Sequence, residues 1–337
     1  MIDFKKFVEI VNKNSKFVIT THINPDGDAL GSQLALAYFL KKLGKEVELI
    51  NHSQTPGNYK FLNEENLIKQ YNKKFDNIIL NADALIAVDF NEITRVKSMV
   101  DVFQRSKAYK ICIDHHTNPK NFVDEFFCDT DYSATGEIIF ELIKSYGENL
   151  FDKKIADALY TAIMTDTGSF RFERTSPKVH RIIAELLEMG TNPTEIYNKI
   201  YNELSTAKLK LLGSGISNIQ SNSDGSISYM VITQEMLKSA EANEEDVDGF
   251  VNFCLSIKSA KIGILFFELA DGVKASLRSR DTFPVSLLAE KFGGGGHINA
   301  AGIRFYDKQL DEVIPQLLQQ TEKDLTEFEK RGSNAEV

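Results

Sequence analysis

In the first half of the chain, short apolar runs alternate with stretches whose apolar residues have helical spacing. Four runs are typical of buried strands, at 16–20, 46–50, 84–88 and 110–113. Helices are expected at 29–43 and near 134–146, 153–164 and 177–189. This alternation predicts an α/β domain in which a parallel sheet carries helices on both faces. Ligands of such sheets bind beyond the carboxyl ends of the strands.

The pattern changes after residue 190. A polar helical stretch follows, bracketed by Gly and Pro, and we interpret residues 191–215 as a helical linker. Later elements are strands at 226–232, 261–269, 273–280 and 303–306, a helix from Pro284, a glycine run and a charged C-terminal helix before a disordered tail at 331–337. We therefore predict two domains, residues 1–190 and a smaller α/β domain at 216–330.

Size and charge narrow the class of protein. A chain of 337 residues exceeds what one hydrophobic core usually serves, which agrees with two domains. A net charge of -9 makes it a poor binder of long duplex nucleic acid, which is held mainly through neutralised phosphates. The three widely spaced cysteines indicate a reducing compartment. Because the chain starts without a signal peptide and has no run of roughly 20 apolar residues, we expect a cytoplasmic protein that does not enter a membrane.

The first candidate for chemistry is the segment that follows the strand at 16–20. It contains His22, Asp26 and Asp28, and one glycine separates the two acids. Both carboxylates can therefore point into one crevice. The alternative is a turn in which Asp28 caps the next helix, since Asp-Gly-Asp is a common turn composition.

Acidic and imidazole side chains follow three further elements. Asp89 ends the apolar run ALIAV, Asp166 follows an apolar helix, and Asp114, His115 and His116 follow another apolar run. The acids could simply be cap or turn residues. However, adjacent histidines after a buried strand are unusual, and the neighbouring acid could orient one of them. An acid at a helix C-terminus also opposes the helix dipole unless a cation is present.

Together these residues favour a metal site, because all of them lie just beyond a strand or helix end. Carboxylates and imidazoles suit Mn²⁺, Mg²⁺ or Co²⁺ better than a thiolate-bound metal. Two such ions about 3.5–4 Å apart can hold both the attacking and the leaving oxygen of a phosphoryl displacement, if one carboxylate bridges them. The pattern thus predicts a two-metal phosphoester hydrolase.

The motifs THINPDGDALGS, AVDF, DHH and TAIMTDTGSF resemble, in their order and context, those of the DHH phosphoesterase superfamily. KASLRSR followed by GGGGHINAAG is similar to the C-terminal substrate-binding domain of the DHHA1 type. The length and this pairing resemble the nanoRNase/pAp phosphatase branch. Its members degrade very short oligonucleotides and often dephosphorylate 3'-phosphoadenosine 5'-phosphate (pAp).

The resemblance implies a role for each residue of the first domain. The implied ligands of two divalent metal ions, Mn²⁺ above all, are His22, Asp26, Asp28, Asp89, His115 and Asp166. Asp89 would bridge the two ions. Asp114 would support the site, and His116 would approach the scissile phosphate as a charge stabiliser or as a proton donor to the leaving oxygen.

The second domain carries candidate substrate contacts. Arg278 and Arg280 are two apart on a predicted strand and so would share a face, where guanidinium groups suit phosphate oxygens. The glycine run 293–296 can bring backbone N–H groups close to a phosphate or a base. Two surface arginines and a flexible loop are the plainer alternatives. The resemblance favours recognition of a 5'-phosphate or base by Arg278, Ser279, Arg280, Gly295, Gly296 and His297.

We therefore predict a Mn²⁺-dependent exonuclease that acts on short oligoribonucleotides and on pAp, with its active site in the cleft between the two domains. Alternatives are a cyclic-dinucleotide or pApA phosphodiesterase, an inorganic pyrophosphatase or exopolyphosphatase, and a non-catalytic nucleotide sensor. The glycine run, as a platform for a nucleoside, argues against pyrophosphatase. The complete set of ligand positions argues against a sensor. A homodimer is expected, because symmetric dimers are the commonest soluble oligomers.

Overall fold

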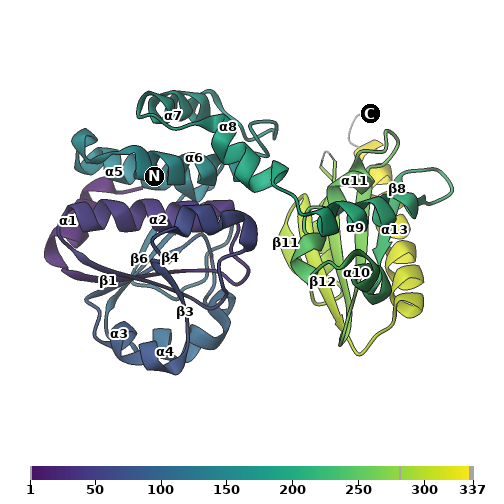
Figure 1. Ribbon diagram of the computed structural model, residues 1–337, viewed down its shortest axis with the longest axis horizontal. Coiled ribbons are helices and arrows are strands. Elements are labelled where there is room, and N and C mark those ends of the chain that lie inside the picture. The colour runs from purple at the N-terminus through teal and green to yellow at the C-terminus, as the bar shows by residue number, and fades with distance from the viewer. Residues whose placement is uncertain (1, 281, 334–337) are drawn as a thin grey trace. The chain divides into compact units, whose positions relative to one another are not determined.

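The computed structural model describes residues 2–280 and 282–333, which fold into two compact units (Figure 1). Unit 1 ends at Glu203 and unit 2 begins at Leu204, so the boundary lies within the segment 191–215 that the sequence predicts as a linker. In the described part of the chain, each unit is built on one six-stranded sheet. The predicted α/β fold class is confirmed.

Unit 1 holds a parallel sheet in the order β3-β2-β1-β4-β5-β6. Its strands are β1 (Lys16–Thr21), β2 (Glu46–Asn51), β3 (Ile68–Gln70), β4 (Ala84–Val88), β5 (Tyr109–Asp114) and β6 (Glu125–Cys128). Its helices are α1 (Phe4–Lys13), α2 (Gly27–Lys42), α3 (Asp76–Leu80), α4 (Val100–Arg105), α5 (Thr135–Tyr146), α6 (Lys153–Asp166), α7 (Pro177–Glu188) and α8 (Pro193–Tyr197). The strand order reverses between β1 and β4, and such a switch point is where open α/β sheets bind ligands.

Helices cover both faces of this sheet, because successive residues of a strand point to opposite sides. Phe17 and Ile19 of β1 belong to the core shared with α2, α5 and α6, whereas Val18 belongs to the core shared with α4. Figure 1 shows α2, α5 and α6 on one side of the sheet and α3 and α4 on the other. Burial on both faces explains why the strands are continuous apolar runs in the sequence.

Glycines let α2 pack closely against α6. A Cβ on Gly31 would lie 2.3 Å from the carbonyl oxygen of Ala158, and one on Gly27 would lie 2.5 Å from a side chain of the same helix. Asp28 stands between these two glycines on α2, and Asp166 is the last residue of α6. The close approach of the helices therefore brings two carboxylates of the predicted metal site toward each other.

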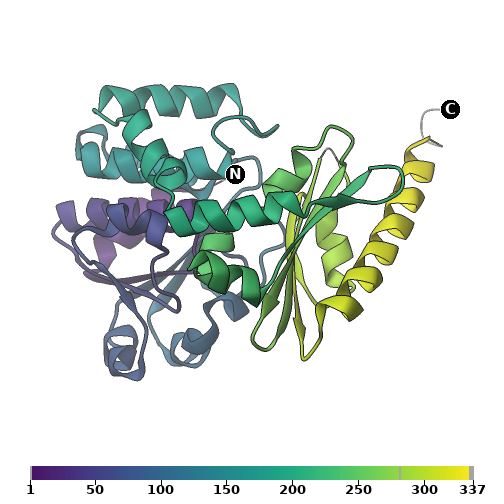
Figure 2. The ribbon, with the colours of Figure 1, turned by 45° about the vertical axis from the view of Figure 1, so that its right-hand side comes forward.

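Unit 2 holds a mixed sheet in the order β11-β12-β10-β9-β8-β7, in which β8 and β9 are parallel and the other pairs are antiparallel. Its strands are β7 (Gln220–Ser221), β8 (Ile227–Ile232), β9 (Ile262–Leu269), β10 (Gly272–Ser279), β11 (Gly295–His297) and β12 (Ala300–Tyr306). Its helices are α9 (Thr206–Ser217), α10 (Gln234–Ala240), α11 (Val251–Leu255), α12 (Val285–Glu290) and α13 (Leu310–Ser333). Figure 2 shows α13 (yellow) running along the sheet, where it shares a core with α12. Helices α9, α10 and α11 share the other core of this unit.

Two details of unit 2 differ from the sequence prediction. Gly213 and Gly215, which we expected to mark the end of the helical linker, lie inside α9. A Cβ on Gly215 would lie 2.6 Å from Sδ of Met230, so this glycine allows α9 to pack against β8. The glycine run is also not a loop throughout, since Gly295–His297 form β11 and pair with β12. Glycine is depleted in strands, which is why the pattern did not predict this one.

Other expectations concern the cysteines, the membrane and the C-terminus. Cys112 and Cys254 are buried free thiols, and Cys128 is a partly buried one. Among the described residues, no helix is both long and apolar enough to cross a bilayer. Helix α13 continues to Ser333, into the segment expected to be a disordered tail, and residues 334–337 lie outside the described part of the chain.

Candidate metal centre

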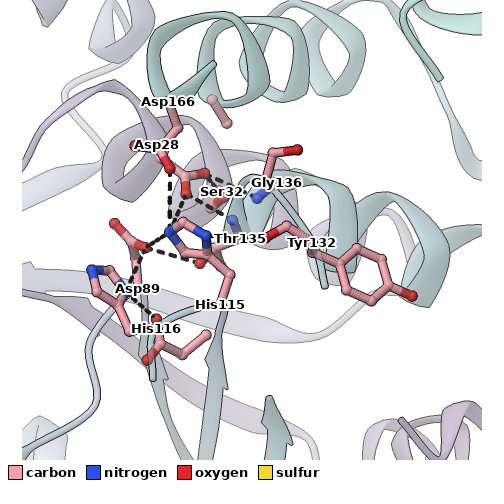
Figure 3. A network of polar contacts seen from close by, with 12 residues as sticks. Asp28, Ser32, Asp89, His115, His116, Tyr132, Thr135, Gly136 and Asp166 are labelled. Carbon is pink, nitrogen blue, oxygen red and sulfur yellow. Dashed lines mark hydrogen bonds and ion pairs between the residues drawn. The ribbon is translucent and has the colours of Figure 1, made fainter. Parts of the chain in front are cut away.

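Polar side chains gather at the carboxyl edge of the unit 1 sheet, next to its switch point. His22 directly follows β1, Asp89 follows β4 and His115 follows β5. These three strands are parallel neighbours, so their carboxyl ends lie side by side. Figure 3 shows Asp28, Asp89 and Asp166 turned toward His115. Residues from four separate parts of the sequence thus meet at one place.

The first group of potential ligands comprises His22, Asp26 and Asp89. The His22 Nε2 atom lies 3.4 Å from Asp89 Oδ2 and 3.9 Å from Asp26 Oδ2. On the other side of the ring, Nδ1 lies 2.8 Å from the carbonyl oxygen of Ile23. That hydrogen bond orients the imidazole, so Nε2 is the nitrogen that faces the carboxylates.

The second group comprises Asp28, His115 and Asp166. The His115 Nε2 atom lies 3.3 Å from Asp166 Oδ2 and 3.8 Å from Asp28 Oδ2. It also lies 3.7 Å from Asp89 Oδ1. The Nδ1 atom of the same ring lies 3.4 Å from the carbonyl oxygen of Tyr132. His115 therefore repeats the arrangement of His22, with one nitrogen on the backbone side and the other toward carboxylates.

Asp28 is buried at the N-terminus of α5. Its carboxylate accepts hydrogen bonds from the backbone N–H groups of Thr135, at 2.7 Å, and Gly136, at 2.9 Å, and from Ser32 Oγ at 3.0 Å. The expectation that Asp28 could cap α2 is wrong, because the N-cap of α2 is Asp26, whose Oδ1 accepts from a backbone N–H of the first turn. Asp28 instead ties α2 to the N-terminus of α5.

Asp89 stands between the two groups. Its backbone is left-handed, with φ of 65°, which is uncommon outside glycine. The N–H of Asp89 donates to the carbonyl oxygen of Ile113 at 2.9 Å, and Thr135 Oγ1 donates to Asp89 Oδ1 at 2.9 Å. These bonds hold the side chain so that Oδ2 faces His22 and Oδ1 faces His115. One carboxylate therefore presents an oxygen to each group, as a bridging ligand must.

His116 lies beside the two groups and contacts Asp114. Its Nδ1 lies 2.7 Å from Asp114 Oδ1 and 3.7 Å from Asp89 Oδ1, and its ring packs edge-on against His115. Burial alone would raise the pKa of Asp114, but the hydrogen bond from His116 and the two nearby imidazoles lower it. An ionised Asp114 holds the proton on Nδ1 of His116, and the second ring nitrogen is then the one available to a substrate.

The electrostatics and the spacing of the donors both fit divalent cations. Burial, and after it the negative charge of neighbouring carboxylates, raises the pKa of Asp28 to about 7 and raises the pKa values of Asp89 and Asp166. A bound cation would reverse this repulsion. Two donors that share one ion at about 2.1 Å stand roughly 3–3.5 Å apart, close to the nitrogen–oxygen distances measured here. These acidic and imidazole groups can hold metal.

The raised pKa of Asp28 predicts an unusual pH dependence of stability in the metal-free protein. Between its ordinary pKa of 3.8 and about 7, the folded state keeps a proton that the unfolded state has released. Stability from this group is therefore full below about pH 4 and is lost as the pH rises toward 7. The quantity to follow is the free energy of unfolding of the wild type minus that of Asp28→Asn, both measured in the presence of chelator. This difference should fall by about 2 kcal/mol from pH 5 to pH 7.

Asp28→Asn is the matched variant, because asparagine keeps the shape but does not titrate in this range. Urea unfolding of both proteins at each pH measures the difference. A difference that is constant from pH 5 to pH 7 would mean that Asp28 ionises in the fold as it does in water, and one that grows with pH would mean that its pKa is lowered instead.

In unit 2, most of the predicted substrate residues lie at one end of the sheet. Arg278 on β10 and His297 on β11 are both register partners of Ala300 on β12, which runs between them. Ser279 is tied to the turn between β11 and β12, because its Oγ and Asn299 Nδ2 lie 3.1 Å apart. Burial lowers the pKa of Arg278. The backbone of His297 lies in β11, whereas its side chain lies outside the described part of the structure.

The guanidinium of Arg280 is engaged by backbone carbonyls. Arg280 lies beyond the end of β10, and its guanidinium donates to the carbonyl oxygens of Leu255, Ile257 and Lys258 at the end of α11. Leu255 is the last residue of α11, and the final carbonyls of a helix have no partner within it, so the arginine acts as a cap. The Arg280 guanidinium is therefore held by these carbonyls, whereas the sequence prediction placed it beside Arg278 on a phosphate.

Some residues that shape the site carry no motif of their own. Ser32, Thr135 and Gly136 hold Asp28, and the backbone of Tyr132 orients His115. A signal existed for two of them, since Thr-Gly at the start of an apolar helix offers backbone N–H groups to an anion. Only contacts over more than 100 residues identify that anion as Asp28.

Unit 1 has a parallel sheet whose strand order reverses between β1 and β4, and four carboxylates and two imidazoles lie at this switch point. This combination of fold and site defines a metal-dependent phosphoester hydrolase. Residues 16–163 match the DHH family, N-terminal domain, and residues 225–326 match the DHHA1 domain. The chain belongs to the DHH family, and it carries a DHHA1 domain in its second unit.

Individual relatives match along nearly the whole chain. A Thermus thermophilus protein named bifunctional oligoribonuclease and PAP phosphatase NrnA is 33% identical over 91% of this chain and 90% of its own. A Bacillus subtilis protein of the same name is 26% identical over 93% and 96%. The crystal structure of an exopolyphosphatase-related protein from Bacteroides fragilis superposes with a TM-score of 0.90, at 33% identity and 96% coverage of both chains.

Proposed function

We propose that this protein degrades short oligoribonucleotides to mononucleotides and also removes a phosphate from pAp. The observation that carries the proposal is the pair of ligand groups on either side of Asp89, in a chain that matches relatives named oligoribonuclease and PAP phosphatase over nine-tenths of their length. The short substrates also agree with the charge of -9, which disfavours long duplex nucleic acid.

We propose that two divalent ions, Mn²⁺ above all, occupy the two groups. His22, Asp26 and Asp89 would hold one ion, and Asp28, His115 and Asp166 would hold the other with the second oxygen of Asp89. When bound, such ions activate water for attack and neutralise charge on the phosphoryl oxygens. The oxygen and nitrogen donors suit Mn²⁺, Mg²⁺ and Co²⁺.

The chain's own residues would supply the proton and the orientation. His116 would donate a proton to the leaving oxygen, or stabilise its charge, from the ring nitrogen that does not contact Asp114. Asp114 would act through His116 as a positioning residue, because its oxygen contacts the imidazole at 2.7 Å. Its lowered pKa keeps it ionised at neutral pH, which suits that role.

Unit 2 would bind the terminal nucleotide. The candidates are Arg278, Ser279, Gly295, Gly296 and His297. Support comes from their common position at one end of the sheet. A Cβ on Gly296 would lie 2.3 Å from the carbonyl oxygen of Ala300, so no larger residue fits at position 296. Arg280 is not part of this proposal, because its guanidinium contacts the end of α11.

A panel of substrates tests the proposal. Purified protein with Mn²⁺ should release mononucleotides from pApA and from a five-residue RNA, and phosphate from pAp. Chelator should remove all three activities. Cyclic di-AMP should be cleaved more slowly than pApA, and pyrophosphate should resist. Hydrolysis of pyrophosphate alone, or of no substrate at all, would contradict the proposal, and the second outcome would favour a nucleotide sensor.

Hydrolysis of polyphosphate is the second candidate. It is favoured by the Bacteroides fragilis structure, which is named exopolyphosphatase-related and has 33% identity. Polyphosphate belongs in the same panel, and turnover of it faster than pApA would establish the alternative. A cytoplasmic location and a homodimer stay predictions from the sequence.

A further inference from the structure

Residues 167–174, called the arch below, form a tight turn immediately after Asp166. Gly168, Ser169 and Phe170 are all left-handed, with φ of 56°, 60° and 65°. Thr167 holds the arch together, since its carbonyl oxygen accepts from the N–H groups of Arg171 and Phe172 at 3.0 Å. Two non-glycine residues in succession rarely adopt this backbone, and such strain persists where surrounding contacts enforce it, often at functional sites.

The arch carries one partly buried phenylalanine and one exposed phenylalanine. The ring of Phe170 packs against Tyr160 and His180, at centroid distances of 5.9 Å. The side chain of Phe172, by contrast, is 56% exposed. Its ring lies on the backbone of Gly168, where an added Cβ would be 2.4 Å from the ring atom Cζ. An aromatic surface is thus exposed to solvent.

This surface lies within reach of the metal centre. Gly168 is two residues from Asp166, so their Cα atoms are at most about 7.6 Å apart. The arch also contacts the loop that orients His115, because Ser133 Oγ donates to the carbonyl oxygen of Arg174 at 2.6 Å and the Arg174 guanidinium donates to Thr130. The Cζ atom of Phe172 is therefore no more than about 12 Å from the Cα atom of Asp166.

Positive charge flanks the exposed ring. Arg171 and Arg174 are both exposed, with Glu173 between Phe172 and the second arginine. The Nε atom of Arg171 donates to the carbonyl oxygen of Gly168 at 2.8 Å, which fixes the start of its guanidinium. Exposed aromatics beside arginines are the usual means by which proteins hold single-stranded nucleic acid, because bases stack on rings and phosphates pair with guanidinium groups.

We propose that Phe172 is the stacking surface for one nucleobase of the oligoribonucleotide, with Arg171 and Arg174 contacting the flanking phosphates. This inference rests on the proposed function and deepens it, since it names the part of the substrate that unit 1 recognises. Stacking does not depend on base identity, because every base has a π-face. The arch would therefore select nucleic acid over pyrophosphate without selecting a sequence.

The experiment compares substrates with and without the base. Hydrolysis is measured on pApA and on its two analogues in which one adenine is replaced by hydrogen. Phe172→Ala should raise the KM for pApA about tenfold and leave kcat within about twofold. On the analogue that lacks the stacked adenine, wild type and Phe172→Ala should have the same KM. Phe172→Tyr keeps an aromatic ring and should behave as wild type, whereas Phe172→Leu should resemble Phe172→Ala.

Tyr197→Ala on α8 is the matched control, because it removes another exposed ring of unit 1, 40% exposed, and should change neither constant. Equal KM values of Phe172→Ala and wild type on pApA would overturn the inference. So would equal losses on all three substrates, or a lowered thermal midpoint that Phe172→Leu shares, because both indicate a structural role. If the wild type hydrolyses none of them, the proposed function itself fails and the inference falls with it.

Discussion

Replacing Asp89 with alanine should abolish hydrolysis of every substrate, lowering kcat/KM by about 10⁴-fold or more. The reason is its position between the two ligand groups, with Oδ2 3.4 Å from His22 and Oδ1 3.7 Å from His115. Loss of this one side chain should lower metal content as well as activity, which elemental analysis of the purified variant measures.

The left-handed backbone of Asp89 requires a second variant. Alanine tolerates φ of 65° poorly, so Asp89→Ala could lose activity through strain alone. Asn accepts this conformation as readily as Asp, and it can still accept the hydrogen bond from Thr135 Oγ1. Asp89→Asn should therefore be as inactive as Asp89→Ala while unfolding at a higher temperature in chelator. An Asp89→Asn protein that keeps two ions and a tenth of its activity would refute the bridging role.

Replacing His116 with glutamine should lower kcat by about 10²–10⁴-fold and leave metal content unchanged. Its Nδ1 is already engaged by Asp114 at 2.7 Å, so the imidazole is oriented as a proton donor rather than as a metal ligand. Substrates whose leaving oxygen needs no proton give the sharpest test. On a p-nitrophenyl ester, the loss should shrink to about tenfold or less.

The geometry of the site also allows His116 to act as a metal ligand. Asp89, His115 and His116 are close enough together to hold an ion themselves. If His116→Gln loses metal, or loses the same factor on the p-nitrophenyl ester as on pApA, His116 is a ligand or a charge stabiliser. Asp114→Asn is the matched control for orientation. It should lower kcat less than His116→Gln does and shift the pH profile, because Asp114 acts only through the ring.

Unit 1 was largely predictable because its strands are buried on both faces. A strand such as β4 has an apolar residue at each position, so composition alone marks it as central. The strands that escaped prediction are short and lie at the sheet edges. β3 has three residues, and β6 has three of four residues only partly buried, so neither leaves a clear pattern.

The candidate ligands were predictable for a related reason. In a parallel sheet, residues that directly follow neighbouring strands must lie at one edge, so His22, Asp89 and His115 converge whatever the loops do. The prediction weakened where no strand sets position. Arg280 stands one residue past β10, and its guanidinium is engaged by carbonyl oxygens at the end of α11, a contact that no local pattern predicts. No sequence pattern singles out Phe172, because only the backbone conformation of the arch makes it differ from a buried phenylalanine.

By itself, the sequence determined the class of fold, the order of the metal-site residues and the chemistry their donors favour, since apolar periodicity and strand ends are local properties. The tertiary structure alone decided which side chains face each other. Asp26 rather than Asp28 caps α2, and Asp28 is held by the N-terminus of α5 across more than 100 residues of chain. Asp89 presents one oxygen to each ligand group, because the left-handed backbone and Thr135 fix its carboxylate. Such contacts depend on packing between distant segments, which no local pattern records.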